Sequence, residues 1–164
     1  MKTISKYIAS VIGGLVSAKS IADYLSSNGR KTSSNTVDDY VEALVESYLF
    51  YSAKRYDIAG ELLLERNRKM YIVDLGLRNY LARKKGSDIG YSIENIVYFE
   101  LLRQGFKVNI GKVGATEVDF VAEKANETEH YHVTASMLEE STFNREILPL
   151  KNIKDFYPEE TINS

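Results

Sequence analysis

The sequence contains no cysteine, which excludes a disulfide framework and a zinc site built from thiolates. No apolar run approaches the roughly 20 residues that a membrane-spanning helix needs. The N-terminal stretch MKTISKYIASVIGGLVSA imitates a signal peptide, but Ser5, Tyr7 and Ser10 interrupt it at a spacing that suits an amphipathic helix. We therefore expect a cytoplasmic protein that does not associate with membranes.

A nucleotide-binding loop is incomplete. The stretch GGLVSAKS, residues 13–20, is one substitution from a P-loop, but Ala18 replaces the glycine that lets backbone N–H groups wrap a phosphate. The residues before it look helical, whereas a P-loop follows a buried strand. The sequence therefore predicts no nucleotide cofactor.

The chain is long enough to bury a real core, as one large domain or two small ones. Of its 164 residues, 44% are hydrophobic and 27% are charged, which is ordinary for a globular protein. The net charge of −2 divides into +5 for residues 1–86 and −7 for residues 87–164. This split predicts two modules, at 1–73 and 87–164, joined by a linking helix over 74–86.

The first module has the element order of a winged helix-turn-helix. A short amphipathic helix over 3–12 precedes a second helix that begins at Ser17 or Ser20 and ends at Gly29. A third helix follows in NTVDDYVEALVESYL, and two extended runs, LFYSAKRYDI and RKMYIVDL, then predict a hairpin that forms the wing. The third helix places its apolar side chains on one face at helical spacing: Val37, Val41, Leu44, Val45 and Tyr48.

The third helix would be the DNA-reading helix of such a module, yet its outward positions are acidic. They include Asp38, Asp39, Glu42 and Glu46, which oppose binding to a polyanion. Basic side chains in the turn and wing offer contacts to a nucleic-acid backbone: Arg30, Lys31, Lys54, Arg55, Arg66, Arg68 and Lys69. A solvated face on a structural or protein-binding module is the favoured interpretation, and weak binding of DNA is the alternative.

The second module has the layout of a PD-(D/E)xK nuclease core. Asp74 caps the linking helix, and a second helix over 91–104 has apolar residues, including Ile96 and Val97, spaced to pack on a sheet. Three strands follow in FKVNIGK, TEVDFVAE and EHYHVTAS. The fold class is therefore α+β or α/β, a winged helix-turn-helix followed by a restriction-endonuclease-like core.

Nucleases of this layout hold Mg²⁺ with carboxylates from the helix and the strands, and a nearby lysine steadies the attacking water. Glu94 and Asp119 fit two of these positions, and Glu117 is a third candidate metal ligand. In the acid-x-lysine element, however, His132 stands at the acid position and Thr134 at the lysine position. The second acid and the lysine are therefore missing, and Mg²⁺ is expected only if the site is retained.

Each candidate also has a plain structural explanation. Glu94 near a helix start is favoured by the helix dipole, and Asp119 is explained by a bond to a neighbouring backbone N–H. His130 and His132 share a strand face, which would suit a transition metal, but no third good ligand is evident. Two surface histidines are the favoured interpretation.

Several segments together resemble a known family: SIADYL, TVDDYVEALVESYLFY, RYDIAGELL, MYIVDLGLRNYL, DIGYSIENIVYFELLRQGFKVNIGKVGATEVDFVAEK and HVT. They are similar to the C-terminal part of predicted bacterial and archaeal AAA-type ATPases that end in domain of unknown function 4143. The resemblance implies a winged-helix linker and a restriction-endonuclease-like domain, with Glu94 and Asp119 as the remaining core acids. The ATPase domain is absent from this chain.

The resemblance implies one further strand after DFYPEETINS, so the core is expected to lack its last strand. A missing strand leaves a sheet edge open to a partner or a second copy. The functional prediction is a non-catalytic interaction or regulatory fragment of such an ATPase. A DNA-binding winged-helix protein and a weak Mg²⁺-dependent DNA nuclease remain the alternatives.

Overall fold

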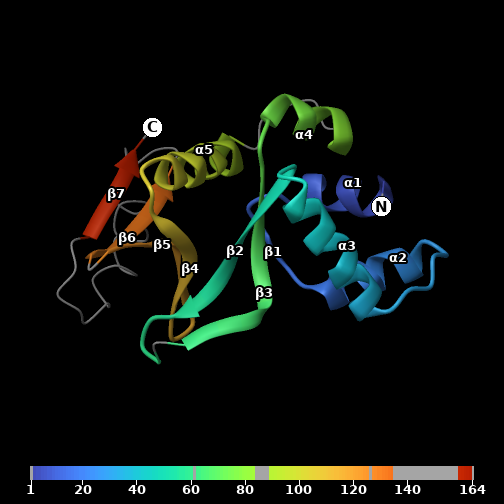
Figure 1. Cartoon of the computed structure of the whole chain (residues 1–164), viewed down its shortest axis with the longest axis horizontal. Coiled ribbons are helices and arrows are strands. Elements are labelled where there is room, and N and C mark those ends of the chain that lie inside the picture. The colour runs from blue at the N-terminus through green and yellow to red at the C-terminus, as the bar shows by residue number, and fades with distance from the viewer. Residues whose placement is uncertain (1, 61, 84–88, 126, 135–158, 164) are drawn as a thin grey trace. The chain divides into compact units, whose positions relative to one another are not determined.

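A computed structural model describes residues 2–60, 62–83, 89–125, 127–134 and 159–163 (Figure 1). Over these residues the fold has five helices and a mixed sheet of seven strands in the order β1-β3-β2-β4-β5-β6-β7. The α+β class predicted from the sequence is confirmed. The chain divides into unit 1, residues 1–52 and 66–87, and unit 2, residues 53–65 and 88–164.

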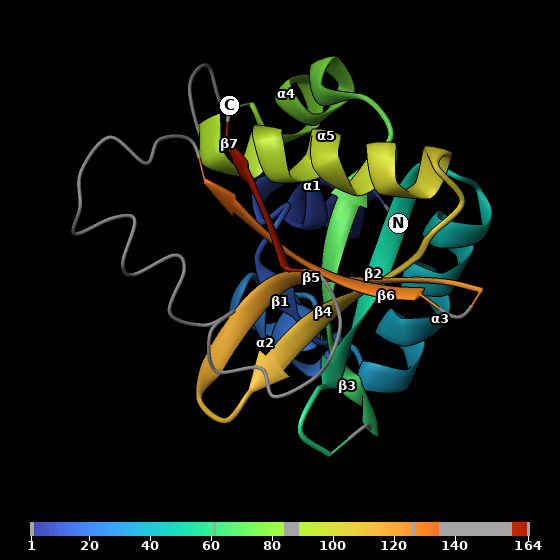
Figure 2. The ribbon, with the colours of Figure 1, turned by 90° about the vertical axis from the view of Figure 1, so that its left-hand side faces the viewer.

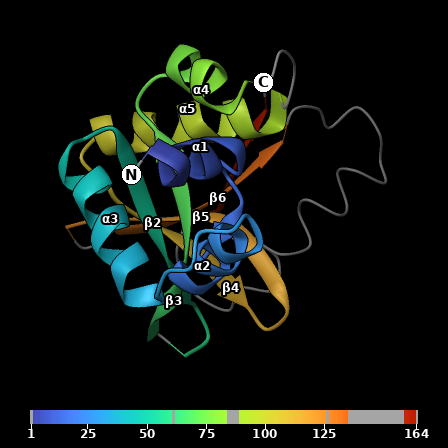
Figure 3. The same cartoon turned by 90° about the vertical axis from the view of Figure 1, so that its right-hand side faces the viewer.

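Unit 1 contains three N-terminal helices, visible in the foreground of Figure 3. They are α1 (Lys2–Ser10), α2 (Ala18–Ser27) and α3 (Ser34–Glu46), with the short strand β1 (Leu15–Val16) between the first two. The long strands β2 (Phe50–Asp57) and β3 (Leu62–Ile72) follow, and β1 pairs antiparallel with β3. One apolar cluster joins these elements, with Ile8, Val37 and Phe50 fully buried.

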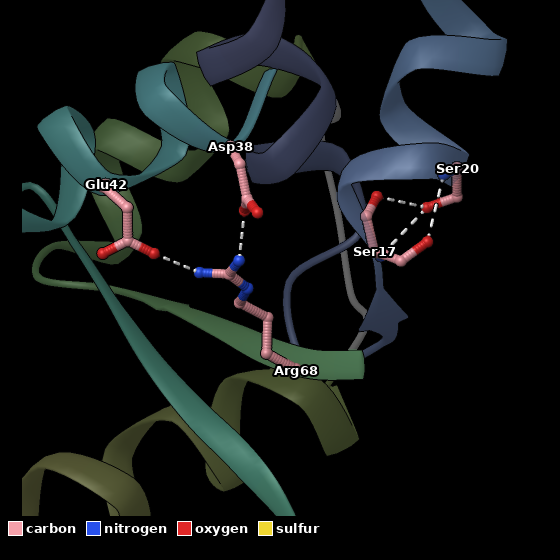
Figure 4. Close-up of polar contacts among 5 residues, drawn as sticks. All are labelled: Ser17, Ser20, Asp38, Glu42 and Arg68. Carbon is pink, nitrogen blue, oxygen red and sulfur yellow. Dashed lines mark hydrogen bonds and ion pairs between the residues drawn. The ribbon is translucent and has the colours of Figure 1, made fainter. Parts of the chain in front are cut away.

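Serine caps begin two of these helices. The Ser17 hydroxyl accepts from Ser20 N–H at 3.1 Å, while Ser17 N–H donates to the Ser20 hydroxyl at 3.0 Å, which makes a capping box at the start of α2 (Figure 4). Ser33 accepts from Thr36 N–H at 3.1 Å at the start of α3. The segment that resembles a P-loop therefore contains a helix start stabilised by its own side chains.

Helix α4 (Leu75–Ala82) belongs to unit 1, whereas residues 74–86 were predicted to link two modules. Asp74 is its N-cap, as predicted, and accepts from Leu77 N–H at 2.5 Å. Leu75, Leu77 and Leu81 pack against the apolar cluster of unit 1, which explains why the helix stays with that unit.

Unit 2 contains helix α5 (Ile89–Arg103), which packs against β4 (Lys107–Val113), β5 (Thr116–Lys124) and β6 (Glu127–Thr134), as Figure 2 shows. β4 pairs antiparallel with β5, and β5 with β6, so these three strands form a meander. Val97 and Leu101 of α5 are buried, as are Phe120 and Val121 of β5. One α5 prediction is wrong: Ile96, expected to face the sheet, is 58% exposed.

The last described strand lies within the segment DFYPEETINS. β7 (Glu159–Asn163) pairs with β6 in parallel, from His130↔Glu159 to Thr134↔Asn163. The strand expected after this segment lies outside the described residues, and its absence stays a prediction. On the other side of the meander, β4 pairs in parallel with β2 through Arg55, Tyr56 and Asp57.

Candidate functional site

Asp119 lies at an irregularity in β5. The β4–β5 register passes from Asn109↔Val121 to Gly111↔Val118, so one residue of β4 faces both Asp119 and Phe120. Such a β-bulge interrupts the alternation of a strand and re-aims the side chains beside it. The bulge therefore decides where the Asp119 carboxylate points.

The Asp119 carboxylate contacts β6 directly. Its Oδ2 accepts a hydrogen bond from Val133 N–H at 2.9 Å, and the same oxygen lies 2.9 Å from His132 Nδ1. The β5–β6 register is regular from Lys124↔Glu127 to Phe120↔Tyr131, and Asp119 is the next residue along β5. A side-chain oxygen thus takes a β6 amide hydrogen at the end of the regular pairing.

This carboxylate–imidazole pair is largely enclosed, with the His132 and Asp119 side chains 12% and 15% exposed. Reduced solvent access strengthens the electrostatic interaction of a carboxylate with a neighbouring polar group relative to that in bulk water. A carboxylate beside Nδ1 constrains the orientation of the ring. Chemically, the pair suits orientation of an imidazole better than binding of a hard cation.

The other predicted nuclease positions lie on the same unit. Glu94 is 7% exposed on α5, which packs against β4, β5 and β6. Glu117 is half-buried and pairs with Lys112 across β4 and β5, and Thr134 is half-buried on β6. Within the described ranges, no three His, Cys, Asp or Glu side chains converge as a metal-binding group.

His130 is a core histidine, whereas a surface position was favoured from the sequence. It is 1% exposed, and its Cα partners are Val121 of β5 and Glu159 of β7. The physical reason is that β6 is an interior strand of the sheet, so this residue has neighbours on both sides.

A second polar cluster lies in unit 1, where Arg68 of β3 reaches two carboxylates of α3 (Figure 4). Its Nη2 donates to Asp38 Oδ1, and its Nη1 donates to Glu42 Oε1 at 2.6 Å. The Arg68 side chain is only 13% exposed, while those of Asp38 and Glu42 are 49% and 59% exposed. We call these three residues the Arg68 clamp.

The remaining basic residues of the predicted nucleic-acid surface are distributed unevenly. Arg30 and Lys31 are exposed, and Arg30 Nη1 donates to the Thr3 hydroxyl at 2.5 Å. Lys54 is exposed and Arg55 half-buried in unit 2, whereas Lys69 is buried in β3 at 4% exposure. The side chain of Arg66 lies outside the described residues. Lys69 and Arg68 therefore do not present free cations to solvent.

Comparison with known proteins covers both units. Residues 1–88 match a family described as Domain of unknown function (DUF8612). The chain belongs to this family. The matched residues include all of unit 1 and residues 53–65 and 88 of unit 2, so the Arg68 clamp lies inside the DUF8612 region and the Asp119–His132 pair lies beyond it.

A relative in Haemophilus influenzae, named only as an uncharacterized protein, is 39% identical over 157 residues. That alignment covers 96% of this chain but 38% of the relative, so the chain spans less than half of the length of the protein that it matches. No solved structure matches the chain. The described helices include none with the length and apolar character to cross a membrane.

The DUF8612 match corrects the resemblance found in the sequence. The chain was similar in several segments to AAA-type ATPases that end in domain of unknown function 4143, and that assignment is wrong. The quoted segments are mostly amphipathic helices and apolar strands, and patterns of this kind recur in unrelated α+β proteins. No role in an ATPase follows for this chain.

Proposed function

We propose that the chain is a non-catalytic interaction module, with a winged-helix-like unit 1 and a nuclease-like unit 2 that has lost its chemistry. The order of α5, β4, β5 and β6, with Asp119 in the middle strand of the meander, supports the nuclease-like layout. The order of α1, β1, α2, α3, β2 and β3, with β1 beside β3, supports the winged-helix layout.

The observation that carries the proposal is the use of Asp119. One oxygen of its carboxylate accepts a hydrogen bond from Val133 N–H and lies against His132. His132 stands at the position where a nuclease has its second acid. Mg²⁺ requires several hard oxygen ligands in near-octahedral geometry, and an imidazole is a poor substitute. The carboxylate then serves to join β5 to β6 and does not anchor a catalytic metal.

Unit 1 is proposed to bind protein and not duplex DNA. Asp38 and Glu42 lie on the helix that reads bases in winged-helix proteins, and they bind the arginine that would otherwise approach phosphate. Asp39 and Glu46 of the same helix are exposed and add further negative charge. Repulsion of the DNA backbone then outweighs the contribution of Arg30 and Lys31.

Exposed leucines near the start of β3 support self-association as one form of interaction. Leu62 and Leu63 of unit 2 are 60% and 36% exposed. β3 lies between β2 and β1, and it pairs with β1 only at Arg68 and Lys69. In the part of the chain that the structure describes, residues 62–67 of β3 have no strand partner on the side away from β2. An apolar strand edge of this kind favours pairing with another strand.

The test of lost chemistry is metal binding and DNA cleavage, on the full chain and on Asp119→Ala. We expect no saturable heat with millimolar Mg²⁺ or Mn²⁺ and no cleavage of single- or double-stranded DNA. Metal-dependent cleavage that Asp119→Ala abolishes would overturn the proposal in favour of a nuclease. Circular dichroism of both proteins controls for folding.

The test of self-association is sedimentation velocity across protein concentrations, on the wild type and on Leu62→Lys/Leu63→Lys. Charged residues on a strand edge oppose pairing, so we expect the double variant to shift the population toward monomer. Lys54→Glu, an exposed change elsewhere on unit 2, is the control. A wild type that is monomeric at every concentration removes self-association from the proposal.

A further inference from the structure

We propose that Arg68 is a masked phosphate-binding residue, which Asp38 and Glu42 withhold from nucleic acid. This inference rests on the proposed function, in which unit 1 does not bind duplex DNA. The inference adds that the ion pairs of Arg68 with Asp38 and Glu42, and not only the net charge of α3, prevent unit 1 from binding duplex DNA.

In the Arg68 clamp, the two acids are more exposed than the arginine that they bind. Asp38 and Glu42 are four residues apart on α3, so they lie on the same side of the helix, one turn from each other. Each takes a different terminal nitrogen of the guanidinium. Because the carboxylates are about half exposed and the arginine is 13% exposed, the acids form the outer layer and the cation lies beneath them.

The backbone beneath Arg68 is fixed. Its Cα partner on β1 is Val16, which is itself buried in the core of unit 1. Loss of the carboxylate charges therefore would not carry the arginine away from α3. The two terminal nitrogens of Arg68 would then remain beside positions 38 and 42 of α3.

The guanidinium N–H groups of Arg68 are suited to bind the oxygens of a phosphate. A guanidinium presents parallel N–H groups that bind carboxylate and phosphate oxygens in the same way. With both acids ionised, the clamp has a net charge of −1 and repels a phosphate. With both acids neutral, the same atoms have a net charge of +1, and Arg68 becomes a phosphate ligand.

The decisive experiment compares two double variants of α3 with equal change in net charge. Asp38→Asn/Glu42→Gln removes the acids that bind Arg68. Asp39→Asn/Glu46→Gln removes two exposed acids that have no ion-pair partner in the described part of the chain. Binding of a labelled duplex is measured by fluorescence anisotropy at several salt concentrations, on the full chain.

We expect Asp38→Asn/Glu42→Gln to bind the duplex about tenfold more tightly than the control pair, because it adds one charged hydrogen-bonding group. Its salt dependence should be steeper by about 0.9, the value for one more phosphate contact. Addition of Arg68→Ala to this variant should reduce its affinity to that of the control pair. Equal affinity of the two double variants, or no effect of Arg68→Ala, would overturn the inference.

Two further measurements keep the outcomes separate. Tight, steeply salt-dependent duplex binding by the wild type would contradict the proposed function itself, whereas failure of the variant comparison would contradict the masking alone. If the Asp38/Glu42 double variant does not fold, the single variants Glu42→Gln and Glu46→Gln form the matched pair, and the same order of affinities is expected.

Discussion

Asp119 and His132 lie on neighbouring strands, and a single carboxylate oxygen contacts both the imidazole Nδ1 and the backbone N–H of Val133. The contact occurs beside a bulge in β5, where the regular pairing with β4 is interrupted. One side chain therefore compensates for an irregular strand and sets the direction of a histidine. Asp119 therefore has a structural role between β5 and β6, as the proposed function requires.

The role of Asp119 in joining β5 to β6 is tested by two substitutions. Asp119→Ala removes the acceptor of the Val133 N–H, and we expect a loss of roughly 1–3 kcal/mol in the free energy of unfolding. Asp119→Asn keeps a carbonyl acceptor, so its free energy of unfolding should fall clearly less than that of Asp119→Ala. Urea denaturation of both variants measures the difference.

Glu123→Ala, which removes a surface ion pair with Lys107, is the control and should change stability by about 0.5 kcal/mol or less. An Asp119→Ala variant as stable as this control would contradict the role.

Strands β4, β5 and β6 of unit 2 were predictable from runs of apolar residues and from the glycine and asparagine between them, whereas the pairing of β4 with β2 and of β6 with β7 was not. The bulge at Asp119 was not predictable. Simple alternation places Val118 and Phe120 on one face and Asp119 and Val121 on the other, whereas Val118, Phe120, Val121 and Ala122 are all buried. An extra residue in one strand depends on its partner strand, and the sequence of β5 alone does not contain it.

The Arg68 clamp should contribute to stability as well as to specificity. Arg68→Ala removes two charged hydrogen bonds from a side chain that is mostly buried, and roughly 1–2 kcal/mol of stability should be lost. Arg103→Ala is the matched control, because Arg103 also binds a carboxylate but its side chain is 73% exposed. Exposed pairs contribute about 0–1 kcal/mol. Thermal unfolding of both variants makes the comparison, and equal losses would show that burial of Arg68 adds nothing.

In unit 1 the sequence identified the helices, an N-cap at Ser17 or Ser20 and a helix end at Gly29. The structure has the cap at Ser17 and Gly29 at a positive φ of 76°. The sequence failed at Tyr48, which was predicted to face the core. α3 ends at Glu46, and Tyr48 has a φ of 56° and is 71% exposed. The pairing of Arg68 with α3 was also beyond prediction, since the partners are 26 and 30 residues away in the chain. Helical periodicity reports a face but not where the helix stops.

Glu100 should titrate at unusually low pH. Hydrogen bonds from Arg103, and next from Gln104, lower the pKa of this carboxyl from 4.5 to about 2. A lowered pKa in the folded protein stabilises it above pH 4.5, and that contribution is lost as the pH falls from 4.5 to 2. Because Glu100 is exposed to solvent, the effect on total stability is small. Carboxyl chemical shifts in a pH titration should show the pKa rising toward 4.5 in Arg103→Gln and rising less in Gln104→Ala. An unchanged pKa in Arg103→Gln would contradict the assignment.

Gly111 is required by the close packing at the bulge. A Cβ at this position would lie 2.8 Å from Val118 Cβ, 2.9 Å from Ile58 Cδ1 and 3.0 Å from Val121 Cγ2. Two of these contacts are to the side chains of Val118 and Val121, on either side of Asp119 in β5, and the Val118 Cβ is bonded directly to the backbone at the bulge. Gly111→Ala should therefore cost roughly 1–3 kcal/mol of stability through overpacking.

The same substitution should also loosen the Asp119–His132 contact, because the bulge that directs the carboxylate is displaced. Two-dimensional NMR should show the amide resonance of Val133 shifting in Gly111→Ala. Gly90→Ala is the control, since nothing lies within 4 Å of an added Cβ there and Gly90 is already part of helix α5. That control should be neutral or slightly stabilising, because alanine has the higher helix propensity. If Gly111→Ala were equally harmless, the sheet would tolerate a side chain at the bulge and Asp119 would not depend on this glycine for its position.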